Sequence, residues 1–395
     1  MNPPKPHLVR LEEVATFLGG STPSRSRSQY FGGGIPWVKT TDLNNGLISE
    51  TEESLSPLGL AESSCKMIPA QAVLVAMYGG FNQIGRTGLL QQDSAINQAL
   101  TAIIPDPQKL NPAFLLEWLN FRVGYWKRFA GSSRKDPNIT KGDVEDFPVP
   151  RMPVDQQIAS ARILATWNAS IEKTERLIAL RARQKAWLLA QVISALGHTT
   201  KLGLFLKQKS QPVPKPTEPY WALGIRSHGK GTFRRFVKDP SSVDMEELYA
   251  VSRDNLIVNI TFAWEGAIAF VKPEDECCLV SHRFPTYEVD CEIADPVFVK
   301  YIVNCKSFFS QLALISPGGA GRNRVLNKKD FLKLEVSLPP LAEQTRLATI
   351  LAATDLLIEK ETSLLVALKQ QKRGLMQKLL TGQWCVPVES KKVAA

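Results

Sequence analysis

Apolar residues recur every seven positions in two long segments of the chain. These positions are Leu164, Ile171, Ile178 and Val192 in the first segment, and Leu351, Ile358, Leu365 and Leu379 in the second. A second apolar seam in the same segments contains Trp167, Leu188, Leu347, Leu368 and Leu375. Seams with a seven-residue spacing are typical of coiled coils. Amphipathic core helices of a bundle are the alternative, but these segments are much longer than the average protein helix of about 11 residues. The pattern therefore predicts two long coiled-coil helices.

The two segments are copies of one sequence, aligned at Pro153 and Pro340. Other matched pairs are Gln157/Gln344, Ile171/Ile358, Lys173/Lys360 and Lys185/Lys372. The last pair interrupts the seven-residue spacing at the same place in both copies. Weaker matches extend upstream, so the duplicated unit covers about half of the chain, a variable domain followed by a long helix.

Glycine and proline mark the ends of these helices. Pro153 and Pro340 stand where a first-turn proline is tolerated, and Gly197 and Gly382 stand where a helix stops. Outside the helices, short apolar alternations, short helical stretches and Gly-rich turns predict mixed domains. The predicted boundaries are 1–152 for a first mixed domain, 153–197 for a central helix, 198–339 for a second mixed domain, 340–382 for a C-terminal helix and 383–395 for a tail.

We expect the two helices to pair antiparallel. A helix of this size spans about 60 Å at 1.5 Å per residue, and antiparallel pairing would relate the two repeats by a pseudo-two-fold axis. A parallel pair would place both domains at one end and lose that symmetry. The predicted fold class is α+β, with two mixed α/β domains joined by two long antiparallel coiled-coil helices.

The chain is basic, with a formal net charge of +10 and a pI of about 9.2. This charge suits an anionic partner, but it does not by itself distinguish nucleic acid, a membrane surface or an acidic protein. Basic and amide residues gather in Gly-rich turns of both domains, where backbone can approach a ligand closely. Such side chains bind base edges and phosphates, so matched basic turns in two repeated domains favour nucleic acid.

The candidate DNA contacts come from these turns and from one aromatic side chain beside them. In the first domain they are Arg25, Lys39, Tyr78, Asn82, Gln83, Arg86, Arg134 and Lys135. In the second domain they are Arg226, His228, Lys230, Arg234, Arg322 and Arg324. The sequence does not divide them into base readers and phosphate contacts.

Catalytic and metal-binding patterns are absent from the sequence. There is no nucleophile motif, no phosphate-binding loop and no metal-ligand spacing, and the residues 2–4, "NPP", lack the aromatic that an adenine methyltransferase uses to hold a flipped base. The six cysteines form no disulfide-like framework, so we expect reduced, mostly buried thiols in a cytoplasmic protein. No apolar run suggests a signal peptide or a membrane span. We expect no cofactor and no metal.

The architecture resembles the specificity subunits of type I restriction–modification enzymes. The resemblance rests on "LEEVATFLGGSTPSRSRSQYFGGGIPWVKTTDL" (11–43), "INQALTAIIP" (96–105), "NITKGDVEDFPVPRMPVDQQIASARIL" (138–164) and "NRVLNKKDFLKLEVSLPPLAEQTRLATIL" (323–351). It implies that each domain reads one half of a split, asymmetric double-stranded DNA site. It also implies that the helices set the spacer and dock methyltransferase subunits, one per repeat, while a separate motor-nuclease subunit cuts. The edges 158–173 and 345–360 are the expected docking surfaces.

Two other functions fit parts of the sequence. One is a coiled-coil scaffold that binds acidic proteins, and DNA binding that ignores sequence would favour it. The other is a self-sufficient adenine methyltransferase, which methylation of DNA by the purified chain alone would favour.

Overall fold

The computed structural model describes residues 7–78, 82–130, 138–195, 199–318 and 324–387. The chain forms two compact units, and each one contains part of both long helices. Unit 1 comprises residues 1–175 and 363–395, and unit 2 comprises residues 176–362.

Unit 1 contains three sheets. A mixed five-stranded sheet has the order β2-β10-β7-β8-β4, a four-stranded sheet has the order β5-β3-β9-β6, and β1 pairs with β11. The strands are β1 (Leu8–Arg10), β2 (Ala15–Gly19), β3 (Phe31–Val38), β4 (Gly46–Ile48), β5 (Glu53–Leu55), β6 (Met67–Ile68), β7 (Val73–Ala76), β8 (Thr87–Leu90), β9 (Ser94–Ile96), β10 (Leu100–Pro105) and β11 (Pro148–Pro150). The helices beside the sheets are α1 (Pro57–Ala61), α2 (Pro112–Phe121), α3 (Val123–Ala130) and α4 (Lys141–Glu145).

Unit 2 repeats this plan with different strand lengths. Its sheets have the orders β13-β21-β18-β19 and β14-β17-β20-β15-β16, and β12 pairs with β22. The strands are β12 (Thr199–Lys201), β13 (Leu206–Lys209), β14 (Pro212–Pro214), β15 (Tyr220–Ile225), β16 (Thr232–Val237), β17 (Glu247–Ala250), β18 (Leu256–Val258), β19 (Ile268–Phe270), β20 (Cys278–Val280), β21 (Thr286–Val289) and β22 (Glu335–Ser337). The helices are α6 (Pro296–Val303), α7 (Lys306–Leu314) and α8 (Lys328–Phe331).

The two long helices are α5 (Val154–Ala195) and α9 (Leu341–Leu380), of 42 and 40 residues. Both begin directly after the prolines that the sequence singled out. Gly382 adopts a left-handed conformation with φ +72° shortly after α9 ends, as expected of a glycine that stops a helix. Gly197 lies outside the described residues. The prediction of two long helices is confirmed.

The helices pair antiparallel within each unit. In unit 1, Glu175 of α5 forms an ion pair with Lys369 of α9. In unit 2, Arg181 pairs with Glu361, and Lys185, four residues further along α5, pairs with Asp355, six residues earlier on α9. Partner numbers fall along α9 as they rise along α5, which confirms the antiparallel prediction.

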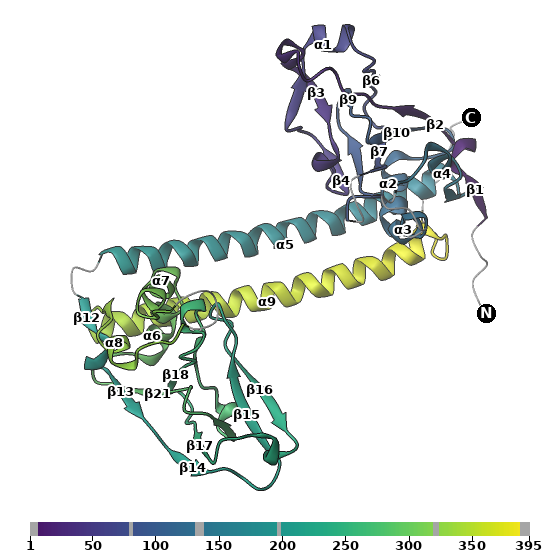
Figure 1. Cartoon of the computed structure of the whole chain (residues 1–395). Helices are drawn as coiled ribbons and strands as arrows, with labels where there is room; N and C mark the ends of the chain where they lie inside the picture. Colours follow the sequence, from purple (N-terminus) through teal and green to yellow (C-terminus); the bar gives the residue numbers. More distant parts are fainter. Residues whose placement is uncertain (1–6, 79–81, 131–137, 196–198, 319–323, 388–395) are drawn as a thin grey trace. The chain divides into compact units, whose positions relative to one another are not determined.

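Both cores include residues of the long helices. In unit 1, Leu164 of α5 and Leu379 of α9 are buried with Phe114 of α2. In unit 2, Leu347 of α9 is buried with Phe298 of α6, and α6 and α7 lie beside the start of α9 (Figure 1). Each recognition domain is therefore continuous in its packing with the helix pair.

The cysteines only partly match the expectation. All six are free thiols, but only Cys65 and Cys278 are buried, while Cys277, Cys291 and Cys385 are exposed and Cys305 is intermediate. The expectation of mostly buried thiols was wrong, because the exposed ones lie outside the helices and strands: Cys277 directly before β20, Cys291 after β21 and Cys385 after α9. None of the described helices is long and apolar enough to cross a membrane.

Candidate nucleic-acid interface

A buried glutamine attaches the first helix of each recognition domain to the start of a long helix. Gln157 of α5 donates from Nε2 to the carbonyls of Lys109 (2.9 Å) and Met152 (2.9 Å), and its Oε1 accepts from the amide of Asn111 (2.8 Å). Asn111 is the N-cap of α2 and accepts from the Phe114 amide. Two contacts therefore hold the start of α2, the side chain of its N-cap Asn111 and the side chain of Gln157.

Gln344 makes the same three contacts in unit 2. Its Nε2 donates to the carbonyls of Ile293 (3.0 Å) and Pro339 (2.8 Å), and its Oε1 accepts from the amide of Asp295 (2.9 Å), the N-cap of α6. We call Gln157 and Gln344 the glutamine anchors. The sequence shows that these two glutamines are matched in the repeat. It does not show their role, since their backbone partners lie far away in the chain.

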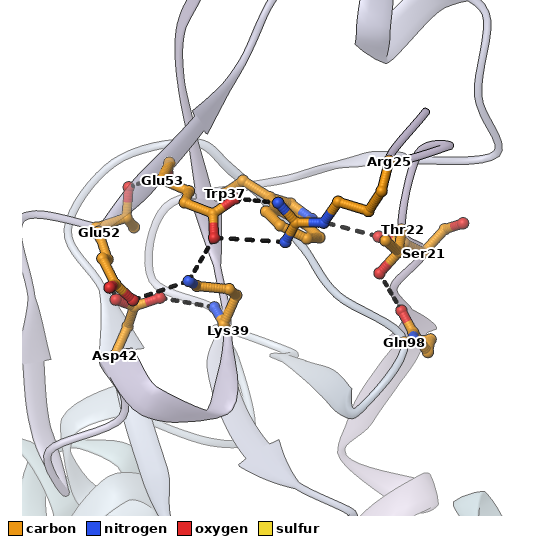
Figure 2. Close-up of polar contacts among 10 residues, drawn as sticks. Ser21, Thr22, Arg25, Trp37, Lys39, Asp42, Glu52, Glu53 and Gln98 are labelled. Atoms are coloured by element: carbon orange, nitrogen blue, oxygen red, sulfur yellow. Dashed lines mark hydrogen bonds and ion pairs between the residues drawn. The ribbon is translucent and has the colours of Figure 1, made fainter. Parts of the chain in front are cut away.

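In unit 1, two predicted contacts form one charged cluster (Figure 2). The Arg25 guanidinium lies 2.6 and 3.3 Å from the two carboxylate oxygens of Glu53, and it covers the rings of Phe31 and Trp37 at 4.7 and 5.0 Å. Lys39 donates to Glu53 (2.6 Å) and to Glu52 on its other side.

The charges of this cluster compensate one another. The hydrogen bonds from Arg25 and then Lys39 lower the pKa of Glu53 to about 2, and those from Glu52 and Glu53 raise the pKa of Lys39. In the free chain, carboxylates thus balance the positive charge of both side chains. A phosphate or a base edge would have to displace the carboxylates to reach them.

The turn between β7 and β8 presents a second group of candidates. Tyr78 is 42% exposed, Asn82 is exposed, and Gln83 and Arg86 are half-buried. The side chains of Asn82, Gln83 and Arg86 make no hydrogen bond or ion pair with other described residues. They are the polar groups of unit 1 most available to a ligand. Arg134 and Lys135 lie outside the described residues.

The backbone of this turn is held by Gly85. Its φ is +75°, and a Cβ there would come within 2.7 Å of the Trp126 ring on α3. Only glycine combines this conformation with so close an approach. Gly85 therefore restrains the backbone directly beside Arg86.

Unit 2 brings several candidates together at the corresponding hairpin, β18–β19. The His228 amide donates to the carbonyl of Glu265 (2.7 Å), and the Gly229 amide donates to that of Gly266 (3.0 Å). These bonds hold the turn 226–231, which carries Arg226, His228 and Lys230, against the hairpin turn. The Arg324 guanidinium lies 5.3 Å from the centre of the Trp264 ring in the same turn.

The other two candidates of unit 2 do not join this group. Arg234 is on β16, where it donates to the Glu274 carbonyl (3.2 Å) and lies over Trp221. Arg322 lies outside the described residues.

The two hairpin turns share one construction. Gly266, like Gly85, has φ +75°, and a Cβ there would come within 3.0 Å of an aromatic ring of the second domain helix, here Phe309 of α7. Phe262 is 41% exposed after β18, as Tyr78 is after β7. Phe262 was not among the candidates predicted from the sequence.

Among the residues that the structure describes, no three His, Cys, Asp or Glu side chains are placed to hold a metal ion.

Comparison with known proteins identifies the family. The model for the type I restriction modification DNA specificity domain matches residues 6–181 and again residues 205–370. The chain belongs to this family. The prediction of the family and of a fold with two such domains is confirmed.

Individual relatives cover different shares of the chain. It is 30% identical over 100 residues to the HindI specificity subunit of Haemophilus influenzae, and the match spans 25% of this chain and 21% of that protein. It is 24% identical over 307 residues to the putative MjaX specificity subunit of Methanocaldococcus jannaschii, covering 72% of this chain and 71% of the relative. The chain thus spans about a fifth of the first relative and about seven tenths of the second.

One solved structure with a similar fold is the type I restriction–modification S subunit from M. genitalium. It has a TM-score of 0.58 and 12% identity, and the match covers 98% of each chain. A second solved structure, which concerns complex assembly and conformational transition of the type I system, has a TM-score of 0.55 and 17% identity to this chain. The match covers 97% of this chain and 99% of that one. At these identities the likeness concerns the fold alone.

Proposed function

We propose that the chain is the DNA-reading subunit of a type I restriction–modification complex, and that each recognition domain reads one half of a bipartite, asymmetric site. The observation that carries this proposal is the shared hairpin turn. A glycine close to a domain helix lies beside Asn82, Gln83 and Arg86 in unit 1. In unit 2 the equivalent glycine lies beside Phe262 and Trp264, and Arg324 lies against the Trp264 ring. One scaffold with unlike side chains would read two unlike half-sites.

The proposed domains keep the boundaries 1–152, 153–197, 198–339, 340–382 and 383–395. In this account the helix pair fixes the spacer between the half-sites. The net charge of +10 favours the DNA backbone, whose phosphates supply most sequence-independent affinity. Arg25 and Lys39 would join the interface only if DNA displaced Glu52 and Glu53.

The long helices would also dock methyltransferase subunits, one per repeat. Residues 345–360 expose three large apolar side chains, Ile350, Leu356 and Leu357. Exposed apolar side chains grouped on one segment are typical of interaction surfaces. The segment 158–173 has no large apolar side chain of comparable exposure, and on α5 such residues begin at Leu177. We therefore favour 345–360 as the principal docking edge.

The chain itself would contribute no catalysis. The methyltransferase subunit would supply S-adenosylmethionine chemistry on adenine, and a motor-nuclease subunit would cut. A coiled-coil scaffold or a self-sufficient methyltransferase would not need two unlike reading turns.

The test uses Arg86→Ala and Arg324→Ala, with Arg373→Ala on the exposed face of α9 as the matched control. Binding is measured against duplexes in which each position of the site is varied in turn. Loss of a base reader should cost about 1–3 kcal/mol and relax one position, whereas loss of a phosphate contact should weaken all sequences alike. Each recognition-domain variant should affect a different half-site. If either relaxes both halves, or if neither differs from the control, the proposal is wrong.

A further inference from the structure

A buried carboxylate in unit 1 joins three helices. Glu117 of α2 is 4% exposed. The Lys372 ammonium of α9 lies 3.1 Å from its Oε2, and Asn168 of α5 donates from Nδ2 to its Oε1 (2.5 Å). We call these three residues lock 1. The Lys372 side chain is only 17% exposed, so this carboxylate replaces much of the water around the ammonium.

Unit 2 contains a corresponding set, lock 2. Here the carboxylate is Asp355 of α9. Lys185 of α5 lies 2.5 Å from its Oδ1, and Tyr301 of α6 donates its hydroxyl to Oδ2 (2.8 Å). The Lys185 ammonium also lies 4.9 Å from the centre of the Tyr301 ring. Burial, followed by the hydrogen bond to Asp355, raises the pKa of Tyr301, which keeps the hydroxyl protonated as a donor.

The two locks occupy equivalent places. The lysines are the matched pair Lys185/Lys372 that interrupts the seven-residue spacing, and Asn168 matches Asp355 in the same register. Glu117 and Tyr301 each stand six residues after the N-cap of their helix. The helix that supplies the carboxylate, however, differs between the two locks. It belongs to the domain helix in lock 1 and to the long helix in lock 2.

In both locks the lysine comes from the other repeat. The first domain is held by Lys372 of the C-terminal helix, and the second by Lys185 of the central helix. Each lock lies eleven residues along the long helix from a glutamine anchor, Gln157 or Gln344. Two contacts separated in this way restrain the rotation of a domain helix on the long helices more than either contact does alone.

We infer that Lys185 and Lys372 are positioning residues that set the orientation in which each recognition domain presents its reading turn. A buried ion pair is weak evidence for stability, because apolar residues of similar volume often stabilise as well. The side chains of Lys372 and Lys185 are half-buried, at 17% and 24% exposed, and such a lysine penalises arrangements in which its carboxylate is displaced. The locks therefore select one docked arrangement, and with it one spacing between the half-sites. This inference rests on the proposed function.

The first test removes the charge. The full chain and its methyltransferase subunit methylate duplexes that carry the site of the unaltered complex, with its native spacer or with one base pair added or removed. Lys372→Met should lower the preference for the native spacer about tenfold, in the range of coupling between contacting residues. Lys372→Arg should retain the preference within about twofold. The control is Lys369→Met, which removes a lysine of α9 from the more exposed pair with Glu175 and should leave the preference unchanged.

The second test rewrites lock 1 as lock 2. Glu117→Tyr alone leaves Lys372 without a carboxylate, and Asn168→Asp alone places two carboxylates beside one lysine. The double variant Glu117→Tyr/Asn168→Asp recreates the chemistry of lock 2 and should recover the spacer preference that Glu117→Tyr loses.

The outcomes separate the two proposals. If the unaltered complex shows no gapped site, the proposed function fails. If it shows one, and Lys372→Met keeps the native preference or Lys369→Met loses as much, the positioning role is wrong. A double variant no better than Glu117→Tyr would also contradict the equivalence of the locks.

Discussion

Replacing Gln344 by leucine should loosen the attachment of α6 to α9. The side chain is fully buried and makes three hydrogen bonds, all to backbone groups, so leucine fills the space but leaves those groups without partners. One of them is the amide of Asp295, the N-cap of α6. The disturbance should therefore appear first in α6.

The size of the effect follows from the groups left behind. A buried polar group that loses its partner costs about 1–3 kcal/mol. Ile293 is a partly exposed residue, so water can replace the hydrogen bond to its carbonyl. The carbonyl of Pro339 and the amide of Asp295 are then the two groups left without a partner. We expect a loss of about 3 kcal/mol in the free energy that opens α6.

Hydrogen exchange of the amides in α6 measures this free energy directly. A loss of about 3 kcal/mol corresponds to roughly 100-fold faster exchange. The matched control is Gln184→Leu, an exposed glutamine on the helix α5 in the same unit, which should change exchange by less than about twofold. If Gln344→Leu exchanges as slowly as the control, the glutamine anchor does not hold the domain.

Two further predictions concern unit 1. Gly85→Ala should destabilise the chain by about 1–3 kcal/mol, since alanine is strained at φ +75° and its Cβ would clash with Trp126. Thermal unfolding measures this loss. The control Gly374→Ala, in open space inside α9, should be neutral or slightly stabilising. Glu53 has a folded pKa of about 2 against an ordinary 4.5, so its contribution to stability is complete above about pH 4.5 and is lost as pH falls towards about 2. In urea unfolding, Glu53→Gln should narrow the difference in midpoint between pH 7 and pH 3, and an unchanged difference would show that the cluster with Arg25 and Lys39 contributes nothing.

The long helices were predictable because their signals are local. Each segment itself contains the seven-residue spacing, the proline at its start and the glycine after its end. Each of these signals occurs in both copies of the repeat. Even the interruption at Lys185 and Lys372 was visible. Its reason was not, because the partners of these lysines come from helices far away in sequence and differ in chemistry, Glu117 in one repeat and Tyr301 with Asp355 in the other.

The candidate contacts were harder to judge from the sequence. Arg25 and Lys39 were chosen for their charge, but the pairing of β3 with β5 places Glu53 opposite Trp37 and so beside both cations. Strand register of this kind is a tertiary property that composition does not reveal. Arg226, His228 and Lys230 were chosen as residues of one Gly-rich turn, and the sequence does not show that backbone hydrogen bonds join this turn to the β18–β19 turn. Glycine content marked the β7–β8 turn, which contains Gly85, but not the β18–β19 turn, which contains Gly266.

The central claim is that two unlike domains read DNA at a separation that the helix pair fixes. Sequencing of methylated adenines in cells with and without this gene measures it most directly. The account predicts a motif that depends on the gene and consists of two different short blocks separated by a gap of constant length. A continuous motif without a gap, two identical blocks, or a gap of variable length would contradict it.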